Sequence, residues 1–225
     1  MIAIFSAGIA PAFALLSFFY LKDRFTEPIA LIVKTFLFGA LLVFPIMFIQ
    51  YAFTAENLTD STFIQSFALI GFTEEFFKWF IFVYLIYNHT EFDAHYDGIV
   101  YAVSISLGFA TVENLLYLLS HGIEYAFVRA LFPVSSHALF GVIMGYHFGK
   151  AKIKEKHKKR NITLALLFPF LLHGSYDYIL TTVTSEWLAL LIPFMILLWF
   201  MGIRRVKTAN QPLLADIDQI RHKKA

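Results

Sequence analysis

The chain is dominated by apolar stretches that run unbroken for about 20 residues between short polar segments. Seven such stretches lie at residues 2–20, 29–53, 63–88, 98–120, 133–149, 162–183 and 187–203. None alternates apolar and polar residues with period two, as the strands of a membrane barrel would. At about 1.5 Å of rise per residue, helices of this length cross a hydrocarbon layer of ~30 Å. The pattern predicts an all-α, polytopic transmembrane bundle of about seven helices.

The composition favours the same class. Hydrophobic residues make up 59% of the chain and charged residues 15%, whereas soluble domains carry about 25% charged residues. The absence of cysteine excludes disulfides, thiolate metal sites and cysteine nucleophiles. The net charge of +2 is too small to indicate a nucleic-acid partner. We expect a single transmembrane domain over residues 1–207, followed by a short cytoplasmic tail over residues 208–225.

The basic residues indicate how the bundle is oriented. Fifteen of the eighteen Lys and Arg residues follow the first, fifth or seventh predicted helix, and most of them lie in segments 150–160 and 204–224. Lys and Arg accumulate on the cytoplasmic side of membrane proteins, so the N-terminus is predicted outside and the C-terminus in the cytoplasm. Segment 150–160 then contacts anionic lipid headgroups rather than nucleic acid. Arg129 is expected in a short loop on the outer side.

A polar loop after the third predicted helix contains Asp93, His95 and Asp97. Their residue types and spacing resemble those of metal ligands. The favoured interpretation is a short polar loop with solvated side chains, because such loops are common on the surface of a membrane bundle.

Nine ionisable residues lie inside the predicted helices, where a charge costs at least ~2.5–3.5 kcal/mol near the bilayer centre. Lys34 and His147 can reach the cytoplasmic edge of the membrane, and seven remain. Such residues must face the interior of the bundle and find partners there. Intramembrane ionisable residues are functional candidates by default. The seven are Glu74, Glu75, Lys78, Glu113, His137, His173 and Asp177.

Their spacing along the helices predicts which of them pair locally. Lys78 follows Glu74 by four residues and Glu75 by three, so one helical face carries two carboxylates and an ammonium. His173 and Asp177 are four residues apart and also share a face. Asp177 is therefore expected to orient His173 by accepting one ring N–H.

Two further helices carry an acid and an imidazole. Glu113 lies one turn after Phe109, and Asn114 beside it is a possible extra donor. His137 begins a helix with a glycine at every fourth position from Gly141 to Gly149. Such a stripe lets a neighbouring backbone approach closely.

The depth of these residues suggests a single site. Counted from the outer ends of the predicted helices, all of the acids and imidazoles fall within roughly 6–18 Å of the outer edge. Four helices therefore place them in one layer of the outer leaflet.

Paired carboxylates with histidines are compatible with two hydrolytic mechanisms. The chain has neither a G-x-S-x-G elbow nor an H-E-x-x-H zinc helix. In the first mechanism a glutamate activates water as a general base and a histidine or asparagine stabilises the oxyanion. In the second, a divalent metal such as Zn²⁺ activates the water, and its candidate ligands are Glu75, Glu113, His137 and His173.

A proton- or cation-coupled transporter is the alternative, since Glu, Asp and His relays also serve transport. Against it, the polar residues stop in the outer leaflet, and no inverted repeat is visible. Hydrolysis is therefore favoured.

For a hydrolytic site we expect Glu75 or Glu74 to activate water and Lys78 to tune the properties of that glutamate pair. Glu113 would be a second acid or ligand, and His137 and His173 oxyanion donors or metal ligands.

Four ordered motifs carry a resemblance to a known family. They are Glu74-Glu75-x-x-Lys78, Phe109-x-x-x-Glu113, His137-x-x-x-Gly141 and His173-x-x-x-Asp177. Together with the length and the number of spans, they resemble the PrsW family of bacterial membrane proteases, which are distantly related to the CAAX prenyl endopeptidases.

The resemblance implies a multi-pass protein of the bacterial cell membrane. It implies a protease that makes the first, outer-side cut in a single-span anti-sigma factor, so that an extracytoplasmic-function sigma factor is later released under envelope stress. By position, Glu74 and Glu75 match the paired acids of the family, Glu113 its second acid, and His137 and His173 its histidines. The resemblance leaves the choice between a metal and a glutamate-activated water open.

Overall fold

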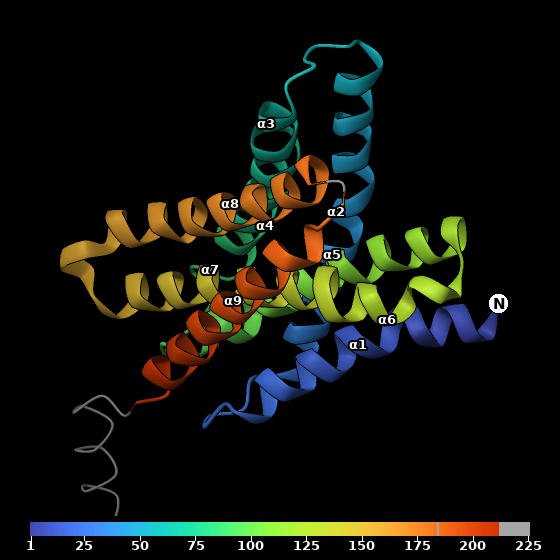
Figure 1. The fold of residues 1–225 in the computed structure, drawn as a ribbon. Coiled ribbons are helices and arrows are strands. Elements are labelled where there is room, and N and C mark those ends of the chain that lie inside the picture. The colour runs from blue at the N-terminus through green and yellow to red at the C-terminus, as the bar shows by residue number, and fades with distance from the viewer. Residues whose placement is uncertain (184, 212–225) are drawn as a thin grey trace, which may run out of the picture.

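The structure is a computed structural model that describes residues 1–183 and 185–211, and every regular element in these residues is helical. Residues 212–225 of the expected tail lie outside the described residues. The elements, in order, are α1 (Ile2–Leu21), α2 (Ile29–Ala55), α3 (Thr62–Ile64), η1 (Gln65–Phe72), α4 (Thr73–Leu85), α5 (Asp97–His121), η2 (Ile123–Tyr125), α6 (Ala126–Arg129), η3 (Ala130–Val134), α7 (Ser135–Ile153), η4 (Glu155–His157), α8 (Lys158–Thr182) and α9 (Trp187–Ala209). Figure 1 shows their arrangement.

The prediction of a polytopic helical bundle is confirmed. Six helical stretches are long and apolar enough to cross a membrane, at residues 2–21, 29–55, 97–121, 123–153, 158–182 and 187–209. The remaining predicted span is also helical but is built from three consecutive pieces, α3, η1 and α4. This interrupted helix carries the paired glutamates.

The predicted start of the fifth helix at residue 133 is wrong. The chain is helical from Ile123 onward, and Pro133 lies inside the π-helical turn η3 rather than at a helix start. Proline lacks an N–H and crowds the preceding turn, and a widened turn accommodates it without ending the helix. Arg129 is consequently on α6, only 9% exposed, and not in an external loop.

Helix α5 lies at the centre of the bundle, packed against α1, α2 and α7. Its first half is buried on all sides, as Tyr101 and Leu107 illustrate. The predicted glycine stripe on α7 does bring two backbones together, because a Cβ on Gly145 would collide with the backbone at Gly98. The outer helices α1, α2 and α9 expose large apolar side chains, as a lipid-facing surface requires.

Helices α7 and α8 run side by side and are joined through η4 (Figure 1). The ring centroids of His137 and His173 lie 5.1 Å apart between them. The π-helical segment η1 packs against α8. The two backbones approach closely where Gly71 meets Gly174: a Cβ on Gly71 would lie 2.9 Å from the Gly174 nitrogen. This approach places the start of α4 beside His173.

Candidate functional site

The site is organised around the buried ammonium of Lys78. Glu74 and Glu75 begin α4 directly after the π-helical turns of η1, a type of distortion frequent at functional sites. Lys78 Nζ lies 3.3 Å from Glu74 Oε2 and 2.8 Å from Glu75 Oε1. Both Lys78 and Glu75 are 0% exposed. The local pairing expected from the residue spacing is therefore present.

The same ammonium fixes the tautomer of His137. Lys78 Nζ lies 3.2 Å from His137 Nδ1, and since an ammonium has no acceptor, Nδ1 must accept this hydrogen bond. The ring proton is then on Nε2, which donates to Glu113 Oε2 at 2.9 Å. The ring of Phe109 lies 4.2 Å below the ammonium. Glu113 therefore orients His137 and leaves Nδ1 facing the centre of the site.

His173 is held in a similar way by a different carboxylate. Its Nδ1 pairs with Glu75 Oε1 at 2.9 Å, and its ring stacks on Phe140 with centroids 5.0 Å apart. Its Nε2 lies 3.9 Å from Glu74 Oε2 and 3.3 Å from Asp177 Oδ2. Asp177 Oδ2 nonetheless has no hydrogen-bond partner among the described residues. The ring N–H bond expected for Asp177 is thus made by Glu75 instead.

These contacts join all seven ionisable residues of the predicted set into one network drawn from four helical segments, α4, α5, α7 and α8. The structure therefore brings them together.

Arg129 belongs to this network and was missed by the sequence analysis. Its Nε donates to Asn114 Oδ1 at 2.9 Å, its Nη2 lies 3.3 Å from Glu113 Oε1, and its guanidinium lies 4.1 Å from the centre of the Tyr117 ring. Asn114 in turn donates to the Gly8 carbonyl. Asn114 therefore holds Arg129 and is not the free donor that was expected. Because a helix was expected to begin at Pro133, Arg129 was assigned to the preceding loop, where an arginine does not indicate a site.

Gln50 of α2 was also missed. Its Nε2 donates to Glu74 Oε1 at 3.3 Å. The signal was a single amide in a predicted span whose only other polar residues are Lys34 and Thr35, and it could have been recognised. Gln50 thus restrains Glu74, which at 6% is the more exposed glutamate of the pair, since Glu75 is fully buried.

The network has more negative than positive groups. Its four carboxylates face two permanently charged cations, Lys78 and Arg129, so with neutral imidazoles two carboxylates are left uncompensated. Glu75 Oε2 and Asp177 Oδ2 are buried, and neither has a hydrogen-bond partner in the described part of the chain. Glu75 has Lys78 as its cation, whereas no Lys or Arg of the described residues pairs with Asp177, so Asp177 requires a proton or a further cation.

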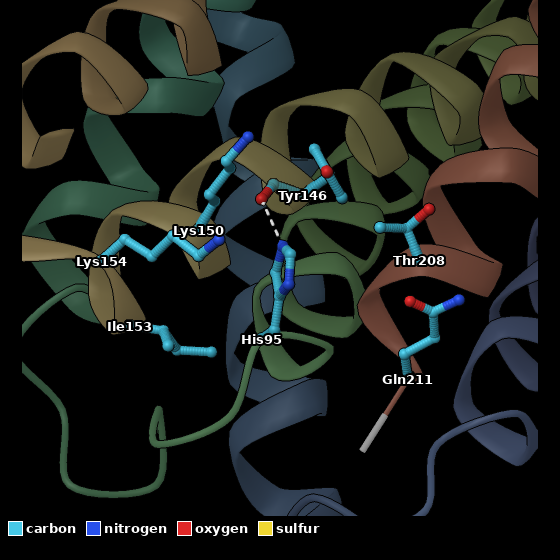
Figure 2. Close-up of a pocket in the computed structure, with 7 residues that line it drawn as sticks. All are labelled: His95, Tyr146, Lys150, Ile153, Lys154, Thr208 and Gln211. Atoms are coloured by element: carbon cyan, nitrogen blue, oxygen red, sulfur yellow. Dashed lines mark hydrogen bonds between the residues drawn. The ribbon is translucent and has the colours of Figure 1, made fainter. Parts of the chain in front are cut away.

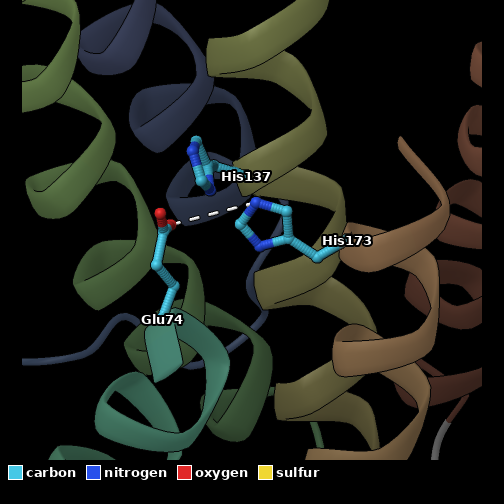
Figure 3. A group of neighbouring side chains, drawn as sticks. All are labelled: Glu74, His137 and His173. Carbon is cyan, nitrogen blue, oxygen red and sulfur yellow. Dashed lines mark ion pairs between the residues drawn. The ribbon is translucent and has the colours of Figure 1, made fainter. Parts of the chain in front are cut away.

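Three of these residues could hold a metal ion. Glu74, His137 and His173 each place one ligand atom within 4.8 Å of the other two (Figure 3). Two imidazoles and one carboxylate are a known donor set of catalytic zinc sites. Glu75 and Glu113, both expected as ligands, instead hydrogen-bond the far nitrogens of the histidines. A carboxylate behind each histidine is the arrangement that orients metal-binding imidazoles. The residues therefore fit a metal ion.

A pocket of about 240 Å³ lies at the other end of α7 and contains none of these groups. Figure 2 shows its lining, in which His95 Nε2 lies 2.9 Å from the Tyr146 carbonyl oxygen, beside Lys150 and Lys154. Burial, reinforced by these two lysines, lowers the pKa of His95 to about 4. Asp97, expected in the same loop, is the first residue of α5 and is 0% exposed, so the expectation of solvated side chains is wrong for Asp97.

Comparison with known proteins identifies the family. A sequence profile for "PrsW family intramembrane metalloprotease" matches residues 27–203. The chain belongs to the PrsW family. It is 63% identical to "Protease PrsW" of Oceanobacillus iheyensis over 94% of this chain and 98% of that protein. It is 56% identical to "Protease PrsW" of Bacillus subtilis (93% and 97%), and 32% identical to that of Clostridioides difficile (90% of each). No solved structure matches the chain.

Membership of the PrsW family confirms several predictions. The protein is a multi-pass membrane protease, and the family's description as a metalloprotease agrees with the donor set of Glu74, His137 and His173.

Proposed function

We propose that this PrsW-family protein is a metal-dependent endopeptidase in which Glu74, His137 and His173 hold a divalent ion, Zn²⁺ by the chemistry of the donor set. One observation carries the proposal. Each histidine gives one ring nitrogen to a carboxylate, Glu113 or Glu75. The other nitrogen of His173 faces Glu74, and that of His137 accepts a hydrogen bond from Lys78, which an ion bound there would displace. The histidines are thus oriented as ligands.

When bound, such an ion lowers the pKa of a water and polarises the scissile carbonyl. Glu74 is the proposed ligand, and Glu75 Oε1 is held by Lys78 and His173, so we assign the role of base, expected for Glu75 or Glu74, to Asp177. Its Oδ2 is buried, lacks a hydrogen-bond partner within the described residues and lies 3.3 Å from His173 Nε2, and it takes the proton from the attacking water. The water oxygen bonds to the peptide carbon, the C–N bond breaks, and Asp177 returns the proton to the leaving amine. Lys78 holds Glu74 and Glu75 in place beside His173.

We propose that the substrate is a single-span anti-sigma factor cut on the outer side of the membrane. On α7, His137 lies at the Ser135 end, opposite Lys150, and on α8 Asp177 lies at the end opposite Lys158. The site is thus in the half of the bundle away from the basic segments, which by their charge belong in the cytoplasm. We propose with it an external N-terminus, from the distribution of the basic residues, and a single transmembrane domain over residues 1–207.

The test is cleavage of a purified single-span anti-sigma factor in proteoliposomes. We expect wild type to cut once, near the outer end of the substrate's span, and Glu74→Gln to lose at least ~10²-fold in rate, because an isosteric amide is a poor metal ligand. Glu56→Gln, an exposed acid at the end of α2, is the matched control and should retain full activity. Wild-type rates for Glu74→Gln would refute the assigned site. Cleavage of other membrane proteins but not of the anti-sigma factor would refute only the substrate.

A further inference from the structure

A second cluster of acids lies outside the catalytic network. Asp23 and Glu27 stand in the connection between α1 and α2, and Asp97 is the first residue of α5. One carboxylate oxygen from each lies within 4.8 Å of the other two. Glu27 is 6% exposed and Asp97 is 0% exposed, so the fold brings two distant parts of the chain together around buried carboxylates.

One carboxylate oxygen of Asp97 is buried without a hydrogen-bond partner among the described residues. Its Oδ2 accepts the backbone N–H groups of Asp93 at 3.0 Å and Ala94 at 2.6 Å. Its Oδ1 is buried and has no hydrogen-bond partner within the described residues, and the same is true of Asp23 Oδ2. A buried acceptor without a partner is rare and is usually satisfied by a water molecule or an ion.

The cluster also lacks a counter-charge. No Lys, Arg or His among residues 1–183 and 185–211 forms an ion pair with Asp23, Glu27 or Asp97. Within this range the Tyr101 hydroxyl donates to Glu27 Oε2, and the carboxyl groups of Glu27 and Asp97 also face each other at hydrogen-bonding distance. Burial, with repulsion from Asp97 and Asp23, raises the pKa of Glu27 to about 8. Three acids at this separation need either protons or a cation.

We propose that Asp23, Glu27 and Asp97 bind a hard divalent cation, Mg²⁺ or Ca²⁺, that ties the α1–α2 connection to the start of α5. All of the donors are oxygens, which these cations prefer and which distinguish the site from the histidine-containing catalytic one. Asp23 is only partly buried, so it leaves room for the water ligands that Mg²⁺ retains. The cation would cancel the charge of the cluster and fix the beginning of the helix that carries Glu113.

The test uses the full chain in a detergent with neutral headgroups and carries Glu74→Gln in every sample, so that cation binding at the catalytic site is suppressed. Mg²⁺ and Ca²⁺ are titrated while thermal unfolding is followed, and Tb³⁺ luminescence, sensitised by nearby tyrosines such as Tyr101, reports direct binding. We expect a rise in Tm with either cation, together with displacement of Tb³⁺. Adding Glu27→Gln should weaken binding by about 10- to 100-fold.

Asp23→Asn is the second variant, because Asp23 is partly exposed and its replacement is less disruptive to folding. This variant should also weaken cation binding, whereas Glu56→Gln at the opposite end of α2 should leave it unchanged. Equal cation affinity in the parent, Glu27→Gln and Asp23→Asn proteins would overturn the proposal. An unchanged Tm with no Tb³⁺ signal would overturn it as well. Neither result would affect the proposed protease function, which rests on different residues.

Discussion

Arg129 offers a sharp test of how the catalytic network is held together, because it touches the site only through Glu113. Arg129→Met keeps an unbranched side chain of moderate length but removes the two hydrogen bonds to Asn114 and Glu113 and the contact with Tyr117. Glu113 then has His137 as its remaining partner in the described network. The expected consequence is a Glu113 carboxylate that no longer fixes the orientation of the imidazole.

The size of the effect follows from the three interactions that the guanidinium makes. A hydrogen bond to a charged group contributes about 1.5–3 kcal/mol, and a cation–π contact about 0.5–2 kcal/mol. The Glu113 side chain is 37% exposed, so water replaces part of its interaction with Arg129. We therefore expect a total loss of about 2–3 kcal/mol in unfolding free energy. Loss of a group that orients a metal-binding histidine should lower metal affinity by about 10- to 100-fold.

The assay compares wild type, Arg129→Met and Arg129→Lys for thermal stability, metal affinity and cleavage rate. Arg205→Lys is the matched control, since its guanidinium also lies over a tyrosine ring, 4.7 Å from the centre of Tyr146, but far from the network. Arg129→Lys should recover part of the metal affinity because it retains the charge. A folded Arg129→Met protein with wild-type metal affinity and cleavage would refute the conclusion that Arg129 positions Glu113.

Two further predictions concern packing and pH. Gly71→Ala should lower stability by about 1–3 kcal/mol and activity by roughly 10²-fold, because its Cβ would lie 2.9 Å from the Gly174 nitrogen and push η1 away from α8. In Gly202→Ala the added Cβ would contact only flexible side chains, so activity in the same cleavage assay should be unchanged. Equal losses in both variants would contradict a specific role for the close contact between Gly71 and Gly174. The pKa of His95 is about 4 in the folded chain against an ordinary value of 6.5, so unfolding free energy should fall by up to ~3 kcal/mol as pH drops from about 6.5 to 4. His95→Gln, whose amide can still donate to the Tyr146 carbonyl, should flatten that profile in denaturant titrations, and an unchanged slope would contradict the assignment.

The helical bundle could be predicted from the sequence because each membrane-spanning helix is specified by residues that are close together in the chain. A helix that crosses lipid must satisfy its own backbone and present apolar side chains along its whole length, and this leaves a continuous pattern in the chain. The pairing of Lys78 with Glu74 and Glu75 was predictable for the same reason, since residues three and four apart share a helical face.

The partners that come from other helices were not predictable in this way. Arg129 was missed because Pro133 interrupts the pattern, while the chain stays helical through a widened turn. The choice between Glu74 and Glu75 as metal ligand depends on which oxygens face the imidazoles, and adjacent residues on a helix give the same sequence signal. Here Glu75 Oε1 pairs with Lys78 Nζ and His173 Nδ1, whereas Glu74 Oε2 lies on the side of His173 Nε2.

The most direct test of the central claim is the metal content of purified protein, measured by elemental analysis beside cleavage activity. We predict about one zinc per chain in wild type and a loss of at least ~10-fold in His173→Ala. His147→Ala is the matched control, because His147 is equally buried on α7 but outside the network, and it should retain the metal. Full zinc occupancy in His173→Ala, or cleavage by a wild-type protein freed of metal, would contradict the account.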